Sequence, residues 1–168
     1  MPVFIPQTVL DEMQEHAHTA GAKETGGIFI GSLSRDAASN DILAEVSAEI
    51  PARHALSELH SLTFTAEVWT EVRAALALRR KRNELMLGWW HSHSYLKEVC
   101  KDCRRRKEKT CNTSAVFMSE KDRLVHRTVF NRAFNIAMVI GESPCHGMEY
   151  GLFGWRNGTV QKRAFYIT

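Results

Sequence analysis

The sequence predicts a mixed α/β fold in which one β-sheet packs against helices. Segments with helical spacing of apolar residues alternate with short apolar runs bounded by glycine, which are typical of buried strands. Further strand patterns and a hairpin turn follow near the C-terminus. With 168 residues, 44% hydrophobic and 24% charged, the chain is long enough for a buried core, so residues 1–168 are expected to form one domain.

The first elements are a helix and two strands. Residues 7–20 carry an apolar stripe at helical spacing, and we expect Thr8 to cap this helix and Gly21 to end it. The apolar run at 26–31 is bounded by glycines and predicts a buried strand. Residues 41–50 alternate loosely between polar and apolar side chains and are expected to pair with that strand.

A loop, a long helix and a strand follow. Residues 51–63 are polar and irregular, which indicates a loop. Residues 66–82 have clear helical spacing, and basic residues crowd the last turn, where they suit the helix dipole. Residues 84–90 predict a strand with His91 and His93 at its end, where residues two apart point to the same face.

The C-terminal part is predicted to hold one more helix among strands. Residues 115–118 indicate a strand, and 119–130 a helix capped by Ser119. The sequence Arg-Asn-Gly at 156–158 suits a hairpin turn. Three further strands are expected, at 135–140, 148–155 and 159–166.

Histidines and carboxylates form a pattern that suits metal-assisted hydrolysis. His91, His93 and Asp122 can hold one Zn²⁺ by three protein ligands and leave a fourth position for water. A separate glutamate, Glu24, can take the proton from that water. Each residue alone has an ordinary structural explanation, since for instance an aspartate in the first turn of a helix suits the dipole. Together they predict a hydrolase.

The order of these motifs resembles that of the JAMM, or MPN+, metalloprotease family. Glu24-Thr25-Gly26-Gly27 before a buried strand, then His91-Ser92-His93, then Ser119-Glu120-Lys121-Asp122, match the family patterns E-x-x-G, H-x-H and S-x-x-D. The resemblance covers nearly the whole chain. It implies a cytidine-deaminase-like fold, a mixed, curved sheet flanked by helices, with zinc at its edge.

The resemblance also implies a role for each motif residue. His91, His93 and Asp122 would ligate the catalytic zinc. Glu24 would act as general base, and Ser119 would hydrogen-bond the tetrahedral intermediate. The family implies cleavage of a peptide or isopeptide bond after the C-terminal glycine of a ubiquitin-like protein, and the compact chain looks like a stand-alone prokaryotic deubiquitinase. Two alternatives stay open: a peptidase acting on the C-terminus of a sulfur-carrier protein, and a non-catalytic, zinc-stabilised binding module.

The chain departs from the family pattern around residues 94–114. Ser94 stands where the family has a proline, and the segment before the S-x-x-D motif is longer than in the family, as an insertion would make it. This insertion is basic and has few apolar residues. Its thiols predict a second, structural zinc, because a segment without a core often needs a metal to hold it. The ligands that we expect are Cys100, Cys103, Cys111 and Cys145.

Alternatives for the cysteine site also stay open. His146, His54 or His60 could replace Cys145 as fourth ligand, the cysteines could be unrelated reduced thiols, and Cys100 with Cys103 could be a redox pair.

Charge and hydropathy limit the kinds of partner that we expect for this protein. The net charge of +3 is too small to indicate nucleic-acid binding, and the basic insertion has few aromatic residues for base stacking. No stretch approaches the roughly 20 apolar residues of a membrane span. The first residues have no signal-peptide pattern, so we expect a cytoplasmic protein. A ubiquitin-like protein or its conjugates is the expected partner, and the sequence leaves the oligomeric state open.

Overall fold

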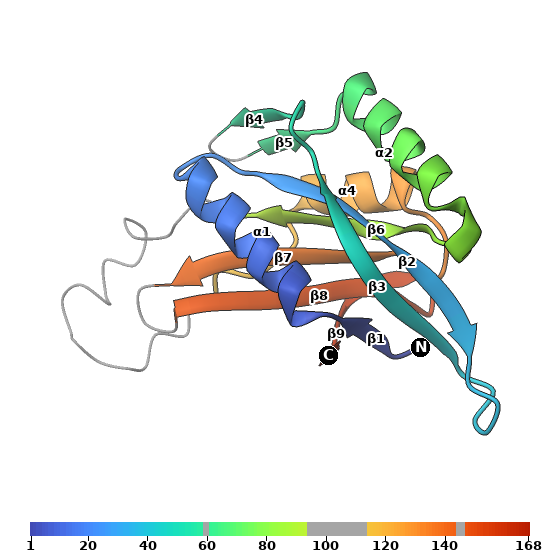
Figure 1. Ribbon diagram of the computed structural model, residues 1–168. Coiled ribbons are helices and arrows are strands. Elements are labelled where there is room, and N and C mark those ends of the chain that lie inside the picture. The colour runs from blue at the N-terminus through green and yellow to red at the C-terminus, as the bar shows by residue number, and fades with distance from the viewer. Residues whose placement is uncertain (59–60, 94–113, 144–146) are drawn as a thin grey trace.

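A computed structural model describes residues 1–58, 61–93, 114–143 and 147–168 (Figure 1). Eight strands form one mixed sheet in the order β10-β1-β3-β2-β6-β7-β8-β9, and β4 pairs with β5 in a separate small sheet. The elements are β1 (Val3–Ile5), α1 (Gln7–Ala20), β2 (Gly26–Arg35), β3 (Ile42–Pro51), β4 (Leu56–Glu58), β5 (Ser61–Thr63), α2 (Ala66–Leu78), the 3-10 turn η1 (Arg80–Arg82), β6 (Leu85–Ser92), α4 (Glu120–Val129), β7 (Ile136–Ser143), β8 (Gly147–Arg156), β9 (Thr159–Arg163) and β10 (Tyr166–Ile167).

Helices cover both faces of the large sheet, as the sequence predicts. The apolar stripe of α1 packs on one face against side chains that include Phe29 and Trp90. Side chains of α2 and α4 pack on the other face, around Trp89 and Phe130. Figure 1 shows α1 in front of the strands and α4 behind them. None of the helices in the described part of the chain has the length and apolar character of a membrane span.

The sheet is curved so far that its two edges approach each other. Strand β9 lies at one edge and β10 at the other, yet only residues 164–165 separate them in the chain. Three Cα–Cα steps join Arg163 to Tyr166 and span at most about 11 Å, so the ends of the edge strands must lie close together. The guanidinium of Arg163 donates a hydrogen bond to the carbonyl oxygen of Met1 across this seam, at 2.6 Å. A short connection and this hydrogen bond therefore join the two edges of the sheet.

Several predicted elements are confirmed. Helix α1 has the predicted bounds and ends at Gly21, whose positive φ of 64° suits glycine. Strands β2 and β3 pair antiparallel, and Ser119 caps α4. The turn between β8 and β9 has positive φ at both Asn157 and Gly158, which is the backbone that a two-residue hairpin favours.

Other predicted elements are wrong. Pro6 precedes α1 and no side chain caps it, so Thr8 has no capping role. Residues 51–63 are not simply a loop, because they contain β4 and β5. The second helix ends at Leu78, and its basic end forms the separate turn η1.

Residues 115–118 are not a strand. Ala115, Val116 and Met118 are buried against the sheet instead of pairing within it, while Phe117 is exposed. The glycines of β7 and β8 make room for the segment. A Cβ at Gly141 would come within 2.8 Å of the Cβ of Ala115, and one at Gly151 within 3.0 Å of the Cβ of Val116. The segment therefore lies close against the backbone of two strands.

A buried carboxyl group lies on the α1 face of the sheet. The Glu49 side chain is 2% exposed, accepts a hydrogen bond from Trp90 Nε1 at 3.0 Å, and lies 3.1 Å from Nδ1 of His16. Burial raises the pKa of Glu49 to about 7. The hydrogen bond from Trp90 lowers this pKa, the charge of Glu12 raises it and the charge of Arg53 lowers it. This carboxyl belongs to the core rather than to the candidate site.

Candidate metal centre

Three potential metal ligands meet where β6 ends and α4 begins. His91 is the buried, next-to-last residue of β6, His93 follows the strand, and Asp122 lies in the first turn of α4. The Nε2 atoms of the two histidines are 3.2 Å apart. Oδ2 of Asp122 lies 3.5 Å from Nε2 of His91 and 4.0 Å from Nε2 of His93. All three side chains point to one spot.

The geometry of this cluster fits a metal ion. Ligands about 2.0–2.1 Å from a tetrahedral zinc lie roughly 3.3–3.4 Å from one another, close to the separations just given. Two nitrogens and one carboxylate oxygen are ligands that zinc accepts, and three protein ligands are the number found in catalytic sites. The His93 Nδ1–H is oriented to donate to the carbonyl oxygen of Ala115 at 2.8 Å, which leaves the lone pair of Nε2 for a metal.

Asp122 is held in place by the start of its own helix. Its Oδ2 accepts a hydrogen bond from the Ser119 backbone N–H at 2.7 Å, while the Asp122 N–H donates to Ser119 Oγ at 3.2 Å. This capping box orients the carboxylate. Burial by itself would raise the pKa of Asp122, but hydrogen bonding to His91, the charge of His91 and the Ser119 bonds lower it to about 2. Asp122 is therefore an anion at neutral pH, as a metal ligand has to be.

Glu24 lies beside the cluster and carries a proton more readily than an ordinary carboxylate. Glu24 lies two residues before the start of β2 and is 8% exposed. Burial raises the pKa of Glu24 to about 7; among the neighbouring charges, His91 lowers it, Asp122 raises it and Lys121 lowers it. A carboxyl group with a pKa near neutrality can both accept and return a proton at physiological pH.

Backbone pairing holds the Glu24 segment against the histidine strand. Gly26 pairs with His91 in the antiparallel ladder. The Thr25 N–H donates to Ser92 Oγ at 3.0 Å, and the Ser92 N–H donates to the Thr25 carbonyl oxygen at 2.7 Å. A Cβ at Gly26 would lie 2.3 Å from the Trp90 carbonyl oxygen, so only glycine allows this close approach. The E-x-x-G motif that begins with Glu24 and the H-x-H motif that begins with His91 are therefore held together by backbone pairing and hydrogen bonds.

Two further residues support the site, and the sequence analysis did not single them out. The Trp89 indole stacks on the His91 ring with 4.8 Å between centroids and 13° between planes. Trp89 Nε1 also donates to Nδ1 of His126 on α4, at 3.2 Å. Trp89 thus connects β6, which carries His91 and leads to His93, to the helix that carries Asp122. Alternation along β6 places Trp89 on the same face as His91, and this was the one signal in the sequence.

His126 is a buried, neutral histidine. Burial lowers the pKa of His126 to about 4. Because Nδ1 accepts from Trp89, the proton is on Nε2, which is buried and has no hydrogen-bond partner in the described part of the chain. A buried donor without a partner costs on the order of 1–3 kcal/mol. The tautomer that accepts the hydrogen bond from Trp89 therefore leaves the buried Nε2–H of His126 unpaired among the described residues, which lowers the stability of the fold.

The structure brings together the five residues predicted for the catalytic site. They are Glu24, His91, His93, Ser119 and Asp122. The predicted structural-zinc ligands lie outside the described residues, as do the alternative fourth ligands His60 and His146. The remaining alternative, His54, lies 3.1 Å from the carboxylate of Glu71.

Comparison with known proteins agrees with this fold. The solution structure of protein DSY2949 from Desulfitobacterium hafniense matches with a TM-score of 0.64 and 17% identity, over 99% of this chain and 92% of that chain. At this identity the likeness concerns the fold alone. A comparison with curated proteins gives no match.

The family is shown by a match along more than half of the sequence. A family model described as prokaryotic homologs of the JAB domain matches residues 6–99, which include Glu24, His91 and His93. The match agrees with the resemblance inferred from the motifs. The chain belongs to the family of prokaryotic homologs of the JAB domain.

Proposed function

We propose that this protein is a zinc-dependent peptidase or isopeptidase that cleaves after the C-terminal glycine of a ubiquitin-like protein. The observation that carries the proposal is the position of Glu24, whose pKa is about 7, beside a three-residue cluster that could hold a metal. A purely structural metal site needs no such base. The family includes peptidases, which is consistent with this chemistry.

The residues of the site would divide the work of hydrolysis. Zinc bound to His91, His93 and Asp122 would lower the pKa of a water molecule toward about 7 and polarise the substrate carbonyl. Glu24 Oε would take the proton from the attacking water and deliver it to the leaving amine. Ser119 Oγ accepts from the Asp122 N–H, so its own O–H can donate to the oxygen on which negative charge develops.

The surroundings of the site offer places for an extended peptide. Leu62 of β5 packs over Gly26, because a Cβ at that glycine would lie 2.6 Å from its Cδ2. The small β4–β5 sheet therefore lies next to the candidate site, and in the described structure it is not part of the large sheet. An extended C-terminal tail could add to such an edge as a further strand. Phe117, 53% exposed and in ring contact with His93, provides an apolar surface at the site.

The proposal includes a second, structural zinc. Cys100, Cys103 and Cys111 would supply three thiolates, and Cys145 the fourth. Only the spacing of the cysteines in the sequence supports this part of the proposal. Replacing Cys103 with Ser is expected to remove one zinc equivalent, measured by elemental analysis, and unchanged metal content would contradict it.

The test of the activity uses two glutamate variants. Wild type, E24Q and E15Q are loaded with zinc and incubated with a ubiquitin-like protein joined through its C-terminal glycine to a second protein, either as a linear fusion or to a lysine side chain. Glu15 is exposed on α1, so E15Q is a matched control. We expect E15Q to cleave like wild type. E24Q should keep its zinc and lose activity by about 10²-fold or more.

Each other outcome has a clear meaning. Wild-type activity in E24Q would remove Glu24 from the mechanism. Inactivity of zinc-loaded wild type on both conjugates, with release of a single amino acid from a sulfur-carrier protein, would favour the peptidase alternative. Inactivity on every such substrate would favour the binding module.

A further inference from the structure

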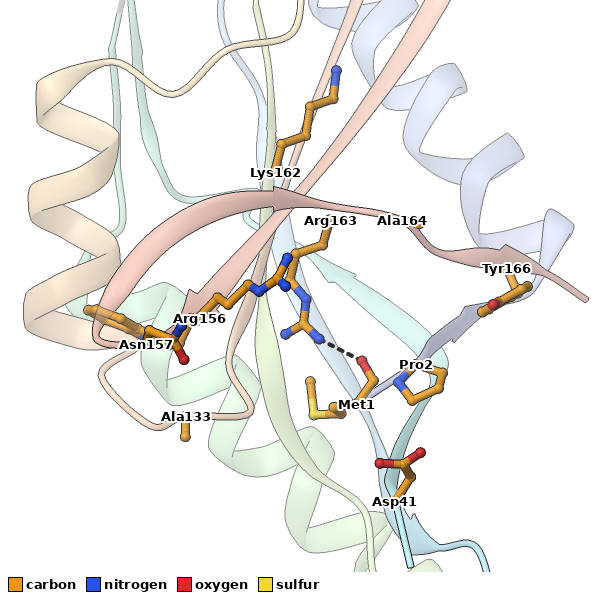
Figure 2. Close-up of a pocket in the computed structure, with 11 residues that line it drawn as sticks. Met1, Pro2, Asp41, Ala133, Arg156, Asn157, Lys162, Arg163, Ala164 and Tyr166 are labelled. Atoms are coloured by element: carbon orange, nitrogen blue, oxygen red, sulfur yellow. Dashed lines mark hydrogen bonds between the residues drawn. The ribbon is translucent and has the colours of Figure 1, made fainter. Parts of the chain in front are cut away.

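A pocket far from the candidate metal centre lies at the seam where the two edges of the sheet meet. A pocket of about 720 Å³ opens between the β8–β9 hairpin and the start of β1 (Figure 2). Its lining includes Arg156, Arg163, Tyr166 and Asp41. Along β8, Arg156 lies five residues beyond the level of His91, or about 17 Å at 3.3–3.4 Å per residue. The pocket is therefore separate from the candidate active site.

Two arginines, Arg156 and Arg163, line this pocket. Figure 2 shows the side chains of Arg156 and Arg163 converging, while Lys162 extends in another direction. Within the described residues neither guanidinium forms an ion pair, and the charge of Arg156, after burial, lowers the pKa of Arg163. Two like charges held together in this way favour an anion between them.

The position of Arg163 is fixed by the surrounding backbone. Its guanidinium, which has five N–H donors, donates one hydrogen bond to the Met1 carbonyl oxygen at 2.6 Å. A Cβ at Gly154 would lie 3.0 Å from Arg163 Cδ, so the side chain lies directly over that glycine. A half-buried arginine held in this way keeps donors free for a ligand. It loses less conformational entropy on binding than an exposed side chain would.

We propose that this pocket binds the phosphate or carboxylate group of a small-molecule anion, with Arg156 and Arg163 donating hydrogen bonds to that group. Arginine suits either group, because its planar fork matches two oxygens at once. The volume is in the range of small-molecule sites and exceeds that of a bare oxyanion. Tyr166, 56% exposed and stacked on Phe4, offers a ring against which the rest of the ligand can pack. Asp41 on the same rim disfavours a long polyanion.

The test maps binding on the zinc-loaded protein by amide NMR, because phosphate could also bind at the metal. Inorganic phosphate, phenyl phosphate and benzoate are titrated separately. We expect saturable shifts at Asn157 and Arg163 with at least one aromatic probe. Stronger binding of phenyl phosphate would identify a phosphate ligand, and stronger binding of benzoate a carboxylate ligand. No saturable shift at the pocket with any probe would overturn the proposal.

Three variants separate a built site from general surface charge. R156Q should weaken binding about tenfold, the loss of one charge-assisted contact. R73Q removes the same charge from an exposed arginine on α2, outside the pocket, and should change affinity less than about twofold. D41N should tighten binding, because it removes a negative charge from the rim. Equal losses in R156Q and R73Q would overturn the proposal. Arg156 is exposed, so its variant is expected to fold even if R163Q does not.

Discussion

Replacing Trp89 with Phe keeps an aromatic ring next to His91 and removes one hydrogen bond. The lost bond is the one from Trp89 Nε1 to His126 Nδ1, at 3.2 Å. His126 would then have both ring nitrogens buried without a partner, because its Nε2 has none among the described residues. An orphaned buried group costs about 1–3 kcal/mol, and the smaller ring adds about 1 kcal/mol for the space it leaves. We expect W89F to lose about 2–4 kcal/mol of unfolding free energy.

The same substitution should weaken metal binding. Trp89 fixes the plane of the His91 ring and connects β6 to the helix that carries Asp122. Loss of groups that orient a metal ligand typically costs 10–100-fold in affinity, and we expect about tenfold here. The assays are urea unfolding of the metal-free protein and competitive zinc titration of the folded protein.

Two further variants make this prediction refutable. In a double-mutant cycle, H126L removes the orphaned group, so W89F and H126L should couple by about 1–2 kcal/mol. The matched control is W69F. Trp69 contacts the rings of Phe64 and Phe130, and its indole N–H makes no hydrogen bond within the described residues. W69F should bind zinc like wild type. A coupling below about 0.5 kcal/mol, or unchanged zinc affinity in W89F, would refute the role given to Trp89.

Three other substitutions test the core, the sheet and the helix cap. Because burial raises the pKa of Glu49 from 4.5 to about 7, the folded state binds its proton more tightly than the unfolded state, and stability should fall as pH rises through that window. E49Q lacks this fall, so above neutral pH its unfolding free energy, measured with urea, should exceed that of wild type by up to about 3 kcal/mol. If the unfolding free energies of the two proteins depended on pH in the same way, the prediction would be wrong. G88A should cost at least about 2 kcal/mol in thermal unfolding, because its Cβ would lie 1.9 Å from the Ile136 carbonyl oxygen; an unchanged melting temperature would count against the strand register. S119A should lose about 1 kcal/mol of stability and some zinc affinity, both restored by S119T, and full affinity in S119A would show that the cap does not position the carboxylate.

The elements that the sequence predicts well are those whose pattern is local. Helix α1 shows its apolar stripe and its terminal Gly21 within one stretch of chain, and β6 shows a continuous apolar run that leads to His91. The motifs of the candidate site are also local, each within a few residues. Their meeting in space followed from the resemblance to a family, and the structure brings these residues together.

The elements that the sequence missed depend on distant partners. Strand β1 has three residues, and its partners are β3 and β10, the latter at the far end of the chain. Residues 115–118 have the apolar pattern of a strand, yet that pattern reports burial rather than pairing, and here Gly141 and Gly151 allow them to pack flat on the sheet. The bond between Trp89 and His126 joins residues 37 apart in the chain, so no spacing rule could have identified it.

The central claim is that His91, His93 and Asp122 bind a metal that is separate from any held by the cysteines. The direct measurement is metal content by elemental analysis of wild type and of the double variant H91A/H93A, each purified with zinc present. We predict two zinc equivalents in wild type and one in the double variant. Wild-type metal content in the double variant would contradict the claim, because the histidine cluster would then hold no metal.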